Sequence, residues 1–269
     1  MSSSFPYKKI LVVGATSGIG QGLAEKFLSE GRSVIVSGRR KENIDSFVSK
    51  HGSKASGTVF DITNLSGIPD WAKQVASDHP DLDCVILNSG IQRGFDFSKP
   101  ETVDLSVVEN EFTTNYLSYI HMAMAFLPIL EKQSESSPAA IAFTTSGLAL
   151  IPLLRCPNYC ASKAALHHWI LCLRQQLQDK GSKVRAIELL PPAVQTELHD
   201  AKHQPDIKDG GNIGIPLNEY VESTWSQLVE GKEQVPVGMS AKAFEEGGFE
   251  TMRQGAFKHM TAMMKKSHS

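Results

Sequence analysis

The stretch Lys9-Ile10-Leu11-Val12-Val13 runs directly into Gly14-Ala15-Thr16-Ser17-Gly18-Ile19-Gly20, and an apolar-periodic segment, residues 21–28, follows. The first segment is short, apolar and β-branched, which is typical of a buried parallel strand. The third segment repeats its apolar residues at helical spacing. A strand, a glycine-rich turn and a helix in this order predict a dinucleotide-binding unit.

The glycines of this turn have separate expected tasks. Gly14 permits the tight turn, Gly18 lets the backbone approach a pyrophosphate, and Gly20 lets the helix pack close to the strand. Free N–H groups and the dipole at the helix start favour the phosphate charge. We therefore expect the turn to bind a dinucleotide through Gly14, Thr16, Ser17, Gly18, Ile19 and Gly20.

Strand-like runs alternate with helix-like stretches along the 269 residues. This alternation implies a parallel sheet that is covered on both faces. No linker or break in composition divides the chain, so we predict one α/β domain over residues 1–269. The expected strands are 9–13, 33–37, 57–60, 84–87, 140–144 and 184–189.

Composition excludes several classes of function. The formal net charge of −2 gives no electrostatic case for nucleic acid. Residues 1–8 contain no apolar h-region and the chain has no 18-residue apolar run, so we expect no signal peptide, no membrane span and a cytoplasmic location. The four cysteines lack metal-site spacing and are interpreted as free thiols. His199 and His203 have no evident third ligand, so no metal is predicted.

Tyr159 and Lys163 lie four residues apart at the start of a helix-like run. This spacing is about one turn and puts both side chains on one helix face. A tyrosine with its usual pKa of about 10 is a poor proton donor near neutrality, and a fixed cation beside it lowers that pKa. The pair therefore predicts a tyrosine that exchanges a proton with an alcohol or ketone oxygen.

Together with the glycine-rich turn, further motifs resemble the short-chain dehydrogenase/reductase family over roughly residues 8 to 200. They are Asp61-Ile62, Asn88-Ser89-Gly90, Asn115 and Ser146, which precede Tyr159-x-x-x-Lys163 in the family's order. The resemblance implies a Rossmann-like, doubly wound parallel sheet of about seven strands. It also implies a homodimer or a homotetramer.

The resemblance implies roles for four residues. Tyr159 is expected to be the general acid/base, and Lys163 to lower its pKa and hold the nicotinamide ribose. Ser146 is expected to hydrogen-bond the substrate oxygen. Asn115 matches the asparagine that holds a water beside the lysine in the family, and the alternative is a buried asparagine that bonds only backbone groups.

The residues after the second strand indicate which dinucleotide the chain prefers. An enzyme that prefers NAD usually places Asp or Glu there, whereas this chain has Ser37-Gly38-Arg39-Arg40. Guanidinium groups bind phosphate well, so we predict a preference for NADP(H), with Arg39 as the main contact and Ser37 and Arg40 beside it. The alternative is that both arginines only start a solvated helix. Asp61 resembles the family aspartate that bonds adenine, with the backbone of Ile62 alongside.

Three positions depart from the family pattern. Val13 and Ser89 replace a common threonine and alanine, and both changes should preserve the backbone around Asn88 and Gly90. In Pro191-Pro192-Ala193-Val194-Gln195-Thr196, Pro192 stands where the family usually has glycine, so it removes an N–H. Val194 and Thr196 still match the positions that meet the carboxamide and the pyrophosphate.

The substrate side is expected to be mostly apolar, which favours a hydrophobic carbonyl compound or alcohol. Residues 197–220 include a glycine-rich stretch that is either a mobile substrate lid or an ordinary loop. The apolar series in residues 240–269 could cover the site, cover the core or contact a partner subunit. Arg155 could meet a carboxylate or lie at the surface. The expected lining residues are Ile91, Gln92, Leu148, Ala149, Leu153, Leu154 and Arg155.

The function that these patterns favour is an NADPH-dependent reductase of ketones or aldehydes that also works in reverse. One alternative is an NADP(H)-binding regulator without turnover, which has no need for Ser146, Tyr159 and Lys163 together. Another is a biosynthetic reductase of an imine or an activated alkene, which the sequence alone does not exclude.

Overall fold

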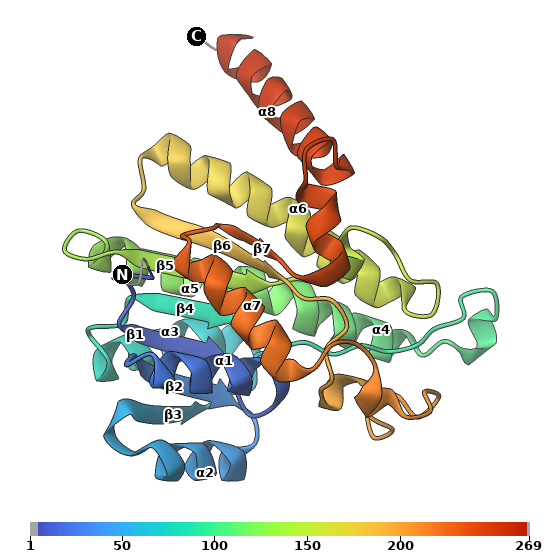
Figure 1. Ribbon diagram of the computed structural model, residues 1–269, viewed down its shortest axis with the longest axis horizontal. Coiled ribbons are helices and arrows are strands. Elements are labelled where there is room, and N and C mark those ends of the chain that lie inside the picture. Colours follow the sequence, from blue (N-terminus) through green and yellow to red (C-terminus); the bar gives the residue numbers. More distant parts are fainter. Residues whose placement is uncertain (1–4, 268–269) are drawn as a thin grey trace.

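β1 (Lys9–Val13) lies in the interior of a seven-stranded parallel sheet, in the order β3-β2-β1-β4-β5-β6-β7 (Figure 1). This computed structural model describes residues 5–267, so the ends of the expected domain, 1–4 and 268–269, lie outside it. The expected strands are confirmed with small shifts of their ends, and a short β7 joins them. The remaining strands are β2 (Ser33–Gly38), β3 (Ala55–Val59), β4 (Cys84–Leu87), β5 (Ala139–Thr144), β6 (Val184–Leu190) and β7 (Gln234–Pro236).

Both faces of the sheet are covered by helices, as the uninterrupted apolar strands require (Figure 1). One face packs against α1 (Gly18–Ser29), α2 (Lys41–His51) and α7 (Leu217–Val229). The other packs against α3 (Ile68–Asp78), α5 (Ser118–Gln133) and α6 (Pro157–Lys180). A shorter helix, α4 (Leu105–Phe112), precedes α5.

The order of the strands reverses its direction between β1 and β4. β2 and β3 lie on one side of β1, and β4 to β7 follow on the other. Val13 pairs with both Ser37 and Leu87, so these strands end at the same level. In such sheets a ligand binds outside the carboxyl ends of the strands at this switch point. The topology therefore places the glycine-rich turn and the segments after β4 and β5 along one edge.

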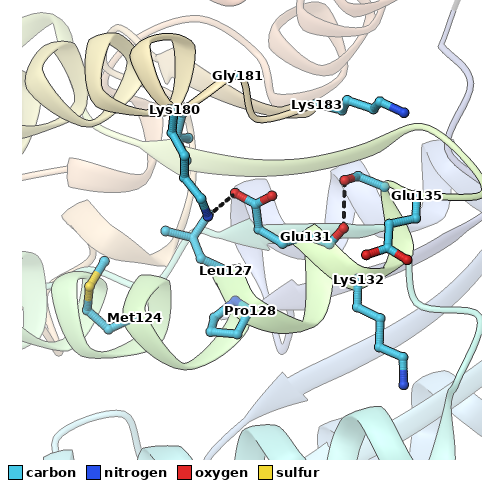
Figure 2. Close-up of a pocket in the computed structure, with 11 residues that line it drawn as sticks. Met124, Leu127, Pro128, Glu131, Lys132, Glu135, Lys180, Gly181 and Lys183 are labelled. Carbon is cyan, nitrogen blue, oxygen red and sulfur yellow. Dashed lines mark hydrogen bonds and ion pairs between the residues drawn. The ribbon is translucent and has the colours of Figure 1, made fainter.

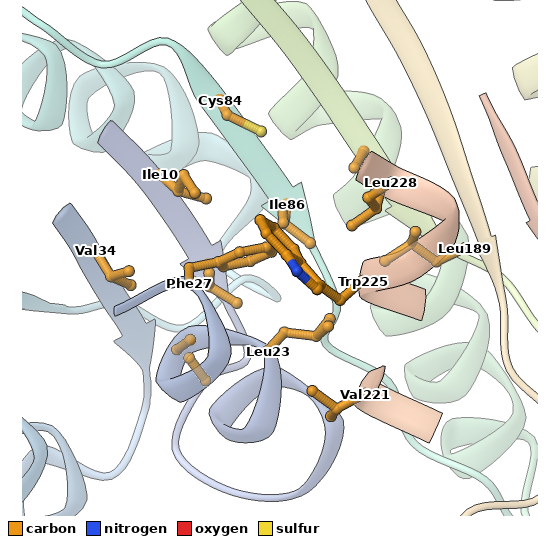
Figure 3. Close-up of a cluster of buried hydrophobic side chains, with 14 of the residues drawn as sticks. Ile10, Leu23, Phe27, Val34, Cys84, Ile86, Leu189, Val221, Trp225 and Leu228 are labelled. Carbon is orange, nitrogen blue, oxygen red and sulfur yellow. The ribbon is translucent and has the colours of Figure 1, made fainter. Parts of the chain in front are cut away.

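An aromatic cluster holds α1 and α7 against the sheet (Figure 3). Phe27 of α1 is fully buried, stacks on Phe5 with ring centroids 5.5 Å apart, and meets Trp225 of α7 edge-on at 6.0 Å. Aromatic pairs in this geometry add to the free energy gained by burying their area. The cluster fixes the helix whose start forms the glycine-rich turn.

The C-terminal helix α8 (Phe249–Ser267) is joined to the body by a buried network at its start and by an ion pair of Lys265 with Asp179 near its end, and it projects past the body (Figure 1). His167 of α6 hydrogen-bonds Glu188 of β6 at 2.7 Å and Glu250 of α8 at 3.2 Å. Arg253 pairs with Glu250 at 2.7 Å. Burial lowers the pKa of His167, but its two carboxylate partners outweigh burial and raise that pKa to about 9. Met252 and Met260, farther along, are exposed.

Among residues 5–267, no helix has both the length and the apolar character that crossing a membrane requires.

Replacing Phe27 with alanine is expected to lower the free energy of unfolding by about 3–5 kcal/mol, because the change leaves a cavity inside the aromatic cluster. Urea denaturation followed by circular dichroism measures the loss. Phe97→Ala is the matched control, since that side chain is 49% exposed and its removal should cost under about 1 kcal/mol. Equal losses in the two variants would contradict the packing described here.

Candidate active site

The glycine-rich turn leaves no room for side chains at its tightest points. Gly14 and Gly18 have φ of 81° and 54°, which disfavour residues with a side chain. A Cβ on Gly20 would lie 2.1 Å from the Gly14 carbonyl oxygen and 2.7 Å from Nδ2 of Asn88. α1 begins at Gly18, so the unpaired N–H groups of its first turn lie at this edge of the sheet.

Two buried polar atoms next to the glycine-rich turn have no hydrogen-bond partner within the described residues. They are Oγ of Ser37, at the end of β2, and Oδ1 of Asn88, just after β4. Nδ2 of Asn88 donates to the Gly14 carbonyl at 3.3 Å, which fixes the orientation of the amide. Buried polar groups are normally paired, so these atoms fit contacts with a bound polar molecule. The residues therefore fit a dinucleotide beside the turn.

Arg40 lies across the glycine-rich turn, while Arg39 points outward. The Arg40 guanidinium donates to Oγ1 of Thr16 at 2.9 Å and to Oγ of Ser17 at 2.5 Å, and it pairs with Glu197 at 2.8 Å. Arg39 has a side chain that is 67% exposed and lies 3.8 Å from Asp61. Arg40 therefore borders the turn and Arg39 lies beside Asp61, whereas the sequence predicts Arg39 as the main contact and does not indicate Glu197.

The two carboxylate oxygens of Asp61 have different partners: Oδ2 forms a long ion pair with Arg39, and Oδ1 accepts hydrogen bonds from a nearby residue. Its Oδ1 accepts hydrogen bonds from the backbone N–H of Thr63 at 2.9 Å and from its hydroxyl at 2.8 Å. These contacts fix the Asp61 side chain just beyond β3, next to the buried Ile62.

Ser146 and Tyr159 meet where β5 ends and α6 begins. Tyr159 lies in the first turn of α6 and is 6% exposed, like Ser146. Burial raises the pKa of the Tyr159 phenol, and its hydrogen bond with Ser146 opposes that rise. Oγ of Ser146 also accepts from the N–H of Leu148 at 3.1 Å, which orients the hydroxyl. The two hydroxyls form a hydrogen-bonded pair at the carboxyl edge of the sheet.

Lys163 is a buried ammonium group held by the strand end. It is 2% exposed, and its Nζ donates to the Thr144 carbonyl at 2.8 Å. Nζ lies 5.1 Å from the ring centroid of Tyr119 and 5.8 Å from that of Tyr159. Burial lowers the pKa of Lys163 to about 7. Among the groups that shift the pKa of Tyr159, Ser146 lowers it in this structure, so the expected lowering by Lys163 stays a prediction.

Asn115 lies in a π-helical turn, Thr113–Leu117, between α4 and α5. Such turns often occur at functional sites. Its Oδ1 accepts from the Ile91 N–H at 3.0 Å, and its Nδ2 donates to the Ile91 carbonyl at 2.9 Å and to Ser162 at 3.2 Å. Asn115 therefore bonds the backbone of Ile91 and the Ser162 hydroxyl, while its role in holding a water beside Lys163 stays a prediction.

The loop after β6 reaches back to the glycine-rich turn. A Cβ on Gly18 would lie 3.2 Å from Cβ of Thr196, so this threonine sits directly against the turn. Val194 is buried and bridges Ile215 in parallel fashion. The Pro192 ring packs near Gly238, and a Cβ added to Gly238 would lie 3.3 Å from Cβ and Cγ of Pro192. The loop at Pro192 is therefore closely packed, although Pro192 has no N–H to donate.

A network around Arg155 fastens the segment after Thr196. The Arg155 guanidinium pairs with both carboxylate oxygens of Asp206, at 2.6 and 2.8 Å, and donates to Gln204 at 2.5 Å. The buried amide of Gln204 donates to Gln92 at 3.0 Å and to the Leu198 carbonyl at 2.6 Å. Arg155 thus binds a carboxylate of this chain, in a bidentate arrangement.

The apolar lining that the sequence predicts is only partly present. Ile91, Leu148 and Ala149 are half-buried, whereas Leu153 is 48% and Leu154 is 93% exposed. Gln92 is buried in the network around Arg155. The region next to Tyr159 therefore combines apolar and polar groups, and Leu154 is directed to solvent.

No group of metal-binding side chains occurs in residues 5–267. His203 instead hydrogen-bonds Asp200 at 2.6 Å, and His199 contacts Gln204 at 3.3 Å. A groove of about 650 Å³ lies between the ends of α5 and α6, where Lys180 pairs with Glu131 at 3.2 Å (Figure 2). None of the predicted site residues lines it.

Three residues near the candidate site were not identified from the sequence. Tyr119 follows Asn115 by one helical turn, and that spacing is the only local signal for it. Glu111, fully buried, accepts from the Arg93 N–H at 2.6 Å and from Asn158 at 2.6 Å, and thereby joins α4 to the start of α6. Glu197 lies next to a predicted contact, Thr196, but its partner is far away in sequence.

Known proteins share both the sequence pattern and the fold. The family model described as short chain dehydrogenase matches residues 8–206. An uncharacterized oxidoreductase, DltE of Bacillus subtilis (strain 168), is 36% identical over 231 residues, which are 84% of this chain and 86% of that protein. Serine 3-dehydrogenase of Rhizobium radiobacter is 32% identical over 218 residues, which are 78% of this chain and 79% of that enzyme.

Solved structures agree with these relatives. A short chain dehydrogenase from Burkholderia cenocepacia J2315, in complex with NADP, superposes with a TM-score of 0.75 at 26% identity. The match covers 95% of this chain and 98% of that structure. The agreement therefore includes the segments on both sides of the glycine-rich turn.

Replacing Asp206 with asparagine is expected to loosen the segment that follows Thr196, because it removes the charge that Arg155 binds. Trypsin should cleave at Lys202 and Lys208 about two to five times faster, as a loss of about 0.4 to 1 kcal/mol predicts. Mass spectrometry of timed digests measures the rates. Asp209→Asn, in the same segment but outside the network, is the control, and equal acceleration by both changes would contradict the fastening role.

Proposed function

The chain belongs to the short-chain dehydrogenase/reductase family, and from that premise we propose that it is an NADP(H)-dependent reductase of ketones or aldehydes that also oxidises the corresponding alcohols. The observation that carries the proposal is the cluster of Ser146, Tyr159 and Lys163 at the carboxyl edge of the sheet. A protein that only binds the cofactor does not need this cluster.

Residues of this chain fit the two ends of the cofactor. The glycine-rich turn and Asn88 would hold the pyrophosphate side, and Lys163, which borders Gly90, would hold the ribose next to the nicotinamide. Val194 and Thr196 would contact the carboxamide and the pyrophosphate. When bound, NADPH supplies the hydride for the carbonyl carbon, while the protein supplies position and electrostatics.

Tyr159 would transfer a proton to or from the substrate oxygen through its phenol Oη. Ser146 would hydrogen-bond the same oxygen and stabilise the charge that develops there. Its hydroxyl already contacts Tyr159 and is oriented by the Leu148 N–H, so little reorganisation is needed. Because burial raises the pKa of Tyr159, a nearby charged ammonium is needed to bring its proton affinity toward the working pH.

The preference for NADP(H) rests on Arg39 and Arg40 at the end of β2. Arg40 is held across the turn by Thr16, Ser17 and Glu197, so its guanidinium would be positioned to bind the additional phosphate of NADP(H). An additional phosphate would compete with the Glu197 carboxylate for Arg40. Arg39, which is mostly exposed, would complete the contact from the outer side.

The substrate is proposed to be a small carbonyl compound or alcohol with an apolar part, in contact with Ile91 and Leu148. The relative named as a serine 3-dehydrogenase supports chemistry at a CH–OH group. We further propose a cytoplasmic enzyme that assembles as a homodimer or homotetramer, as members of this family typically form oligomers.

Replacing Tyr159 with phenylalanine is expected to lower kcat at least about a hundredfold, because it removes the proton-transfer group and leaves the ring in place. NADPH oxidation at constant pH with a panel of ketones, diketones and aldehydes measures turnover, and fluorescence titration should show that NADPH still binds. Tyr220→Phe, on α7, is the control and should keep full activity. Turnover that survives in Tyr159→Phe would refute the mechanism.

Replacing Arg39 or Arg40 with alanine is expected to weaken NADPH binding about tenfold or more, because each removes a charged hydrogen-bond donor to phosphate. NADH binding should change little, which separates a phosphate contact from general damage. Titration of both cofactors by fluorescence measures the dissociation constants. Lys41→Ala, which removes an exposed lysine paired with Asp45, is the control. Parallel weakening of both cofactors would count against the preference.

A further inference from the structure

The buried ammonium of Lys163 lies against an aromatic ring that belongs to none of the residues proposed for catalysis. Nζ is 5.1 Å from the centroid of the Tyr119 ring, within the distance at which a ring face attracts a cation. Tyr119 is fully buried in α5, and Lys163 is 2% exposed in α6. The contact is therefore desolvated, which is where a cation–π interaction is strongest.

The hydroxyl of Tyr119 also forms a hydrogen bond. It donates to the Ser89 carbonyl at 2.5 Å, within the turn Asn88-Ser89-Gly90 that follows β4. A ring that served only to fill the core would need no such bond, and phenylalanine would fill the same space. This hydrogen bond fixes the ring beside Gly90, whose Cβ would lie 3.7 Å from Nζ of Lys163.

We propose that Tyr119 is a positioning residue for Lys163: its ring face keeps the ammonium group charged at the sheet edge, and its hydroxyl fastens that ring to the turn after β4. The proposal deepens the function proposed above, because it assigns the charge on Lys163 to a definite contact. Tyr119 acts through Lys163 and touches neither substrate nor cofactor.

The groups around Lys163 show why the Tyr119 ring matters for the charge of the ammonium group. Burial lowers the pKa of Lys163 to about 7, even though the charge of Glu111 on α4 opposes that change. Tyr159, on the same helix, lies farther from Nζ than Tyr119 does, and the thiols of Cys156 and Cys160 lie beyond it, in contact with Tyr159. Thr144 supplies an uncharged acceptor.

The direction of the effect follows from these contacts. A ring face stabilises the ammonium form only, so weakening it lowers the pKa of Lys163 further. The ammonium would then lose its proton at a lower pH. The proposed reduction needs the charged form of Lys163. The fall of activity on the basic side of the pH profile would therefore move to lower pH.

The test follows the titration of Lys163 itself, by NMR of protein labelled with ¹³C at the lysine ε-carbon. The Lys163→Arg variant, which lacks this signal, assigns it. Tyr119→Phe keeps the ring but removes its hydrogen bond to the Ser89 carbonyl, so the midpoint should fall by less than it does when the ring itself is removed. Tyr119→Leu removes the ring and should lower the midpoint by about one pH unit.

A second set of variants keeps the shape of the ring, in case Tyr119→Leu does not fold. Fluorinated phenylalanines at position 119 weaken the negative ring face stepwise, and the midpoint should fall with each step. The same replacement at Phe126, a buried ring two turns farther along α5 that packs on Trp71, is the control and should leave the midpoint unchanged. Midpoints that stay constant across the series at position 119 would overturn the proposal.

The pH dependence of NADPH-linked turnover separates this proposal from the proposed function. If the NMR midpoint and the basic side of the activity profile move together, both are supported. If the midpoint moves while the activity profile does not, Tyr119 still positions Lys163, and the use of Lys163 in the reaction is wrong.

Discussion

Burial of the Lys163 ammonium is the constraint on which the candidate site depends. A buried charge is costly unless other groups stabilise it, and here the stabilising groups come from separate elements. Thr144 at the end of β5 accepts its hydrogen bond, Tyr119 of α5 presents a ring face, and Tyr159 lies one turn earlier on α6. Holding this one charge therefore aligns a strand end with two helices, and Ser146 follows two residues after Thr144.

The segment after β6 is fastened at two places by partly exposed ion pairs. Glu197 pairs with Arg40 beside the glycine-rich turn, and Asp206 pairs with Arg155 near the start of α6. A ligand phosphate that drew Arg40 away would release the first fastening and leave the second. The same segment thus borders both the proposed cofactor side and the proposed substrate side of the site, which gives the two sides a physical connection.

Much of the site was predictable because its signals are local. The Gly14 to Gly20 turn needs particular backbone angles, and those needs appear as glycines within seven residues. Tyr159 and Lys163 share a helix face at a fixed spacing, so their proximity follows from the helix itself. The partners of Arg40 and Arg155 were not predictable, because Glu197 and Asp206 are 157 and 51 residues away from them in the sequence.

The sequence by itself determined the α/β class, the parallel strands and the glycine-rich turn, since each depends on periodicity or backbone freedom within a short window. Only the tertiary structure decided that Leu154 is directed to solvent, that Asn115 bonds the backbone of Ile91, and that Tyr119 lies against Lys163. These outcomes depend on how separate elements pack, and a buried charge finds its partners across the fold rather than along the chain.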